Sequence, residues 1–97
     1  MLVVVGSFRL DESEPARTAM REVTERTLRE SGCLWYSYAR DIVEPAVVRV
    51  SEGWSDSAAL DAHLAAPHMD EWRRIRSTLG LSDRRMLVFE TSEGIPL

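Results

Sequence analysis

The chain has 97 residues, of which 44% are hydrophobic and 29% charged, and its formal net charge at pH 7 is −4. This length suits one globular domain with a modest core. An acidic chain without a Lys/Arg block is a poor candidate for binding nucleic acid, because that binding depends on neutralising phosphates. The single cysteine, Cys33, excludes an internal disulfide and a multi-cysteine metal site.

A membrane partner is not expected either. No apolar run approaches the ~20 residues that a bilayer-spanning helix needs. The opening MLVVVGSF is apolar, but it lacks a basic leading region and ends too soon for a signal peptide. We therefore expect a cytoplasmic protein.

The first two elements are expected to be a strand and a helix. Residues 2–8 are short and β-branched, which predicts a strand. Residues 11–32 predict a helix, with Ser13 or Asp11 as the N-cap and Gly32 as the left-handed stop. The buried face of this helix is expected at Ala16, Met20, Val23 and Thr27, which recur at helical spacing.

Three further strands follow from the same signals. Residues 33–42 and 47–54 predict two strands, and the chain-breaking EPA at 44–46 should join them as a hairpin. Residues 84–91 predict the last strand, and the tail 92–97 is expected to form an arm. Strict alternation in the second strand would give one face of Leu34, Tyr36 and Tyr38 and another of Cys33, Trp35 and Ala39.

The segment 55–80 is expected to be helical, with Ser55 or Asp56 as its cap. Pro67 interrupts it, because proline lacks a backbone donor and clashes with the preceding turn. We therefore expect a short helix over about residues 57–65 and a second one that begins near Pro67.

The resulting order, βαββαβ, predicts an α+β, ferredoxin-like fold: a four-stranded antiparallel sheet with the helices on one face. The strands are nonetheless apolar on both faces, as where Met86 and Val88 alternate with Leu87 and Phe89. A sheet that meets water on one face should alternate apolar with polar residues. We therefore expect a homodimer in which two sheets pack face to face.

Four short motifs follow one another through the middle of the chain. They are G-C-x-x-Y at Gly32, Cys33 and Tyr36, E-x-W at Glu52 and Trp54, A-L-x-x-H at Ala59, Leu60 and His63, and P-H at Pro67 and His68. In order and spacing they resemble the antibiotic biosynthesis monooxygenase (ABM) family. The resemblance implies a dimeric α/β barrel that oxidises a hydroxylated aromatic, such as a quinol or a polyketide-like phenol, with O₂ and without a cofactor.

His63 and His68 are the only histidines, and an imidazole suits the role of general base near neutral pH. On an unbroken helix their side chains would point about 140° apart. No third histidine or cysteine pair accompanies them, so we expect no metal site. His68 falls on the apolar stripe and is expected to bond a backbone carbonyl or Glu52, unless it is the base. His63, which the family pattern carries, is favoured as the catalytic or orienting histidine.

The remaining candidates each have a structural alternative. Arg49 is expected either to pair with a strand neighbour or to stabilise a developing phenolate. The resemblance implies that Glu52 is buried, and a buried carboxylate is normally paired, here with a histidine or an arginine. The aromatic candidates for a substrate-binding cavity, which could equally fill the core or a dimer seam, are Tyr36, Trp35, Trp54 and Trp72. Trp35 and Trp54 are expected on different faces of the sheet.

Other functions remain open at this stage. An apolar pocket without an ionisable group would favour a non-catalytic dimeric ligand-binding module, whereas a histidine that faces the pocket would favour an enzyme. A haem-binding member of the superfamily would need an axial histidine that faces a large cavity. An isomerase acting on small carbonyl compounds would share the base and the pocket but would not consume oxygen.

Overall fold

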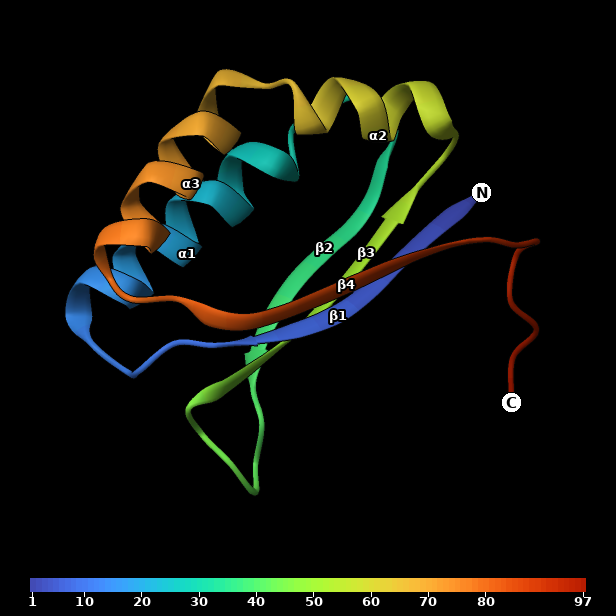
Figure 1. Cartoon of the computed structure of the whole chain (residues 1–97). Helices are drawn as coiled ribbons and strands as arrows, with labels where there is room; N and C mark the ends of the chain where they lie inside the picture. Colours follow the sequence, from blue (N-terminus) through green and yellow to red (C-terminus); the bar gives the residue numbers. More distant parts are fainter.

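The computed structural model describes all 97 residues (Figure 1). Its elements follow in the order β1 (Leu2–Arg9), α1 (Glu14–Thr27), β2 (Cys33–Arg40), β3 (Val47–Trp54), α2 (Ser57–Leu64), α3 (Pro67–Thr78) and β4 (Ser82–Glu90). The strands form one antiparallel sheet in the order β2-β3-β1-β4, and the helices all cover the same face (Figure 1). This confirms the predicted ferredoxin-like arrangement. None of the helices combines the length and apolarity that crossing a bilayer requires.

Helix α1 begins where the capping signal places it and ends earlier than expected. The Ser13 hydroxyl accepts a hydrogen bond from the backbone N–H of Ala16 at 3.2 Å. The helix stops at Thr27, and a turn then leads to Gly32, which has the left-handed φ of +82°. A Cβ at Gly32 would lie 2.5 Å from the Cβ of Ala59, so the turn packs tightly against α2. This turn brings Glu30 to the second helical segment.

The predicted interruption at Pro67 is confirmed. Helix α2 ends at Leu64, and α3 begins at Pro67 after an extended Ala66 with ψ of 142°. Because the chain changes direction between the two helices, the side chains of His63 and His68 come together. Their ring centroids lie 6.2 Å apart, whereas on one continuous helix the two side chains would diverge by about 140°.

The core lies between the helices and the inner face of the sheet. Its main cluster joins the sheet residues Phe8, Val48 and Val50 to the helical residues Ala16, Ala19, Val23, Met69 and Trp72. A smaller cluster, Val4, Tyr36 and Trp54, lies beside α2. Burial of these side chains supplies the main driving force for folding.

A bulge in β2 changes the predicted faces of that strand. Cys33 pairs with Trp54 and Trp35 pairs with Gly53, so Leu34 is an extra residue in the ladder. Cys33 therefore packs against the inner cluster, and Leu34 is half exposed. The predicted faces of Cys33 and Leu34 were wrong, because an inserted residue reverses the alternation. Beyond the bulge, the predicted alternation holds.

The opposite face of the sheet, the outer face, has no cover within this chain. Val5, Leu87 and Phe89 are neighbours across the β1–β4 ladder and are 39%, 43% and 52% exposed. Trp35 also lies on the outer face, with its ring across Gly53. The expectation that the strands are apolar on both faces is therefore confirmed.

We expect Gly53→Ala to lower the free energy of unfolding by about 1–3 kcal/mol, because overpacking forces neighbours to shift. A Cβ at this position would lie 2.3 Å from two atoms of the Trp35 ring. Urea unfolding followed by circular dichroism measures the change. Gly94→Ala is the control, since no atom lies within 4 Å of its new Cβ. Equal stability of the two variants would contradict this packing.

Candidate active site

A cavity of about 210 Å³ lies between the sheet, α2 and α3. Most of its lining is apolar, and the polar or charged groups on it are Tyr36, Tyr38, Glu52, His63, Arg76 and Arg84. An apolar pocket with a few convergent polar groups is the usual form of a small-molecule site. Four of the residues singled out in the sequence line this cavity: Tyr36, Glu52, His63 and Trp72.

His63 is held at the cavity wall by its neighbours. Its side chain is only 1% exposed, and its ring packs against the rings of Trp54 and Tyr36 at centroid distances of 4.6 and 5.4 Å. The Nδ1 atom lies 2.7 Å from Oε2 of Glu30. Because a carboxylate accepts hydrogen bonds, Nδ1 carries the proton, and Nε2 keeps its lone pair. Burial lowers the pKa of His63, although Glu30 opposes this, so the ring is neutral near pH 7.

His68 bonds the same carboxylate from the start of α3. Its Nε2 lies 3.2 Å from Oε2 of Glu30 and 3.3 Å from the hydroxyl of Thr27. His68 does not line the cavity. The expected partners, a backbone carbonyl or Glu52, were wrong. The helix break turns the ring toward the α1–β2 turn instead.

Glu52 is buried and paired, as expected, but its partner differs from the prediction. The indole Nε1 of Trp54 donates a hydrogen bond to Glu52 Oε1 at 3.0 Å, in place of the expected histidine or arginine. Burial raises the pKa of Glu52, while this hydrogen bond and the charge of Arg84 act against the shift. Trp54 is fully buried beneath the cavity and supports His63 and Glu52 without lining it.

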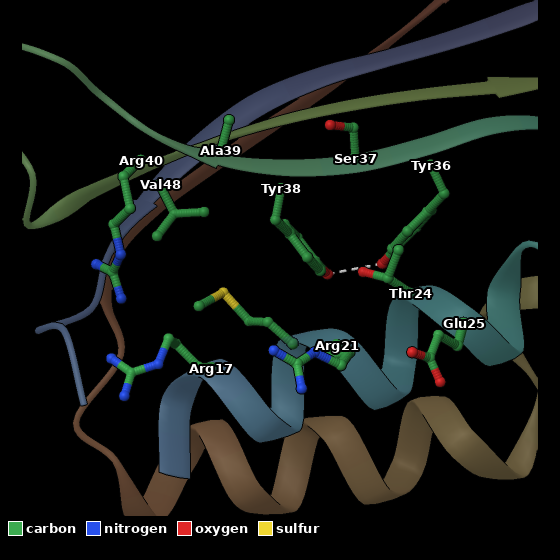
Figure 2. A pocket seen from close by; sticks show the side chains of 11 residues that line it. Arg17, Arg21, Thr24, Glu25, Tyr36, Ser37, Tyr38, Ala39, Arg40 and Val48 are labelled. Carbon is green, nitrogen blue, oxygen red and sulfur yellow. Dashed lines mark hydrogen bonds between the residues drawn. The ribbon is translucent and has the colours of Figure 1, made fainter. Parts of the chain in front are cut away.

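Tyr36 and Tyr38 form a wall between the cavity and a second cleft. That cleft, of about 440 Å³, lies between α1 and β2 (Figure 2). Figure 2 shows both tyrosines pointing from β2 toward α1, with their hydroxyls joined by a 2.6 Å hydrogen bond. Arg17 and Arg40, at one end of the cleft, both pair with Glu12. Of the candidate residues only Tyr36 lines this cleft, so we take the smaller cavity as the candidate site.

The structure places two candidates on the outer face, away from the cavity. Arg49 is 61% exposed, and its Nε lies 3.2 Å from Oδ1 of Asp41, as the ion-pair alternative predicted. The indole of Trp35 donates to the hydroxyl of Ser51 at 2.9 Å. Both positions alternate with inward-facing neighbours, so neither side chain reaches the cavity in its own chain. Trp35 and Trp54 lie on different faces of the sheet, as expected.

Tyr38 and three charged site residues were missed as candidates in the sequence. Arg76 and Arg84, not Arg49, are the cations on the cavity. Arg76 follows Trp72 by one helical turn, which is a usable signal, and its guanidinium lies 5.9 Å from the Trp72 ring centroid. Burial and the nearby Arg84 lower the pKa of Arg76. Glu30 has no such signal, because it stands in a turn far from both histidines along the chain.

The sequence model of the antibiotic biosynthesis monooxygenase family, ABM, matches residues 1–75. The chain belongs to the ABM family. Among curated proteins, no sequence matches it.

Solved structures share the whole fold. A candidate ABM protein from Deinococcus radiodurans is 24% identical to this chain, with a TM-score of 0.90. The match covers 100% of this chain and 98% of the Deinococcus chain. A conserved protein from Methanosarcina mazei is 23% identical, with a TM-score of 0.79 over 94% and 92%. A mutant of SnoaB, a cofactor-independent oxygenase from Streptomyces nogalater, is 18% identical, with a TM-score of 0.75 over 99% and 97%. At these identities the likeness shows the fold alone.

We expect the folded protein to form no tyrosinate near pH 10, where exposed tyrosine titrates. Burial raises the pKa of Tyr38 to about 12 and also raises that of Tyr36, and these are the only two tyrosines. Because the folded state keeps protons that the unfolded state loses, the free energy of unfolding should fall as the pH rises above about 10. Absorbance at 295 nm and circular dichroism, recorded together, test this. A tyrosinate signal centred near pH 10 in folded protein would contradict the buried pair.

Proposed function

We propose that this protein is a cofactor-independent monooxygenase that oxidises a small hydroxylated aromatic compound with O₂. The observation that carries the proposal is the geometry of His63. A neutral imidazole stands at the wall of an apolar cavity, and Nδ1 is bound to the partly buried Glu30 carboxylate. Membership of the ABM family supports the same reaction class.

In the proposed first step, Nε2 of His63 removes a proton from a phenolic hydroxyl of the substrate. Glu30 accepts the hydrogen bond from Nδ1 and so fixes the tautomer that leaves Nε2 free. The same carboxylate stabilises the imidazolium that forms. This is the arrangement of a base oriented by a third group, which typically contributes about 10²–10⁴-fold to a rate.

The cavity also supplies charge for the anion that results. Arg76 and Arg84 line it, and neither forms an ion pair within the chain. A cation in a mostly apolar site stabilises a developing phenolate more strongly than it would in water. In our proposal these two arginines take the role that the sequence pattern suggested for Arg49.

The phenolate then supplies the electrons for the oxidation. It transfers one electron to O₂, and the resulting superoxide and substrate radical join to form a carbon–oxygen bond. The peroxide takes up a proton and breaks its O–O bond, while the carbon that bears it loses its hydrogen. One oxygen atom stays in the product as a new carbonyl, and the other leaves as water.

The size of the cavity favours a small substrate. Its 210 Å³ lies below the ~300–1,000 Å³ of typical ligand pockets. A one- or two-ring phenol or quinol suits this volume better than a three-ring anthrone. A haem macrocycle would need more space, which counts against the haem-binding alternative.

We also propose that the protein acts as a homodimer. The outer face presents Val5, Leu87 and Phe89 to solvent, and a second sheet packed on it would bury them. Two identical faces related by a twofold axis would complement each other. Trp35 and Arg49 would then lie at the subunit interface.

The first test is oxygen uptake by tag-free, chelator-treated protein with hydroquinones, naphthols, dihydroxynaphthalenes and anthrones. We expect uptake with one- and two-ring substrates, and incorporation of one atom of ¹⁸O₂ per product. His63→Gln removes the base but keeps a polar side chain, and it should lower turnover about 10²–10⁴-fold.

Two helix α3 variants provide a matched comparison in that assay. Arg76→Ala should reduce turnover, whereas Arg74→Ala should not, because Arg74 is 65% exposed and pairs with Glu71 outside the cavity. No uptake on any substrate would overturn the oxygenase proposal. Conversion of a carbonyl substrate without oxygen uptake would indicate an isomerase.

The dimer can be tested by light scattering on a size-exclusion column. We expect wild type at twice the 11.0 kDa chain mass, and Phe89→Glu as a monomer, because the change buries unpaired charge in the interface. Leu28→Glu is the control, because Leu28 is as exposed as Phe89 (51% and 52%). Leu28 lies at the end of α1, away from the outer face, so its change should leave the dimer intact. A monomeric wild type, or a dimeric Phe89→Glu variant, would contradict the proposal.

A further inference from the structure

We propose that Glu30, His63 and His68 form a binding site for a divalent transition-metal ion, with Zn²⁺ as the best fit. One ligand atom from each residue lies within 4.8 Å of the other two. The sequence predicted no metal site, because the side chains of its two histidines would diverge on one helix and no third ligand was apparent. The helix break brings the histidines together, and the α1–β2 turn supplies the third ligand.

The donor atoms match zinc in kind and number. Two imidazole nitrogens and one carboxylate oxygen, with water in the fourth position, form a common zinc coordination. Zinc bonds to such atoms are about 2.0–2.2 Å long, so ligands around a tetrahedral ion stand roughly 3.2–3.6 Å apart. Here Oε2 of Glu30 lies 2.7 Å from Nδ1 of His63 and 3.2 Å from Nε2 of His68. To admit the ion, the carboxylate must move about half an ångström away from Nδ1 of His63, and the two histidine nitrogens, which lie within 4.8 Å of each other, must settle at the same spacing.

The surroundings of the three ligands hold them in place. The side chains of His63, His68 and Glu30 are 1%, 14% and 17% exposed, so the site is shielded but reachable from the side of His68 and Glu30. The rings of Trp54 and Tyr36 fix the plane of His63. Such supporting contacts reduce the ordering that binding requires.

A metal at this site has a consequence for His63. Coordination through Nδ1 leaves the proton on Nε2, the nitrogen that lies free in the metal-free protein. The imidazole could then no longer accept a proton from a substrate. Metal binding should therefore inhibit turnover. This consequence rests on the proposed oxygenase function, whereas the metal site itself does not.

The test is titration of tag-free, chelator-stripped protein with Co²⁺, followed by visible absorption, and with Zn²⁺, followed by calorimetry. We expect one ion per chain with micromolar or tighter affinity, and the absorption of a cobalt ion in a low-coordinate nitrogen and oxygen site. Glu30→Gln and His68→Gln should each weaken Zn²⁺ binding at least about tenfold. Two variants are used so that misfolding of one, seen by circular dichroism, leaves the other informative.

Glu52→Gln is the matched control, because Glu52 is a buried carboxylate of the neighbouring cavity that is not a ligand. It should bind Zn²⁺ like wild type. Absence of Zn²⁺ and Co²⁺ binding to wild type at 100-fold excess over ~1 µM protein, or unchanged binding in folded Glu30→Gln and His68→Gln, would overturn the site. If oxygen uptake fails on every substrate while zinc binds, the proposed function fails and the metal site stands.

Discussion

The carboxylate of Glu30 is the contact on which the candidate site depends. It is the common partner of two histidines that come from different helices, and it stands in the turn between α1 and β2. A buried charge without partners would cost several kcal/mol, and so would the loss of one partner from a buried pair. The cluster therefore ties three segments of the chain together and fixes the ring of His63 against the cavity.

The break before Pro67 makes this cluster possible. A continuous helix would direct the two histidines to different sides, and only one of them could reach the turn. With two helices, α2 covers the end of the sheet near Trp54, and α3 packs on the centre beside α1. The seam between them is where the cavity forms, so one proline decides both the geometry of the histidines and the position of the site.

One-sided coverage of the sheet divides its residues between two roles. Inward-facing positions such as Tyr36 and Glu52 build the cavity, and outward-facing positions such as Trp35 and Phe89 form an apolar surface. The fold is shared by proteins across the ABM family at low identity, so it does not by itself specify a reaction. In our proposal the chemistry follows from the side chains that face the cavity, with His63 on α2 as the base and Arg76 and Arg84 on α3 and β4 as the cations.

The sequence by itself determined the order of the elements, the helix break and the doubly apolar sheet, because these follow from local propensity and periodicity. Only the tertiary structure decided which groups meet. Glu30 lies 33 residues from His63 along the chain, and no spacing rule connects a turn to a helix that far away. The bulge at Leu34 and the outward direction of Arg49 depend on strand register, which the pairing of whole strands fixes.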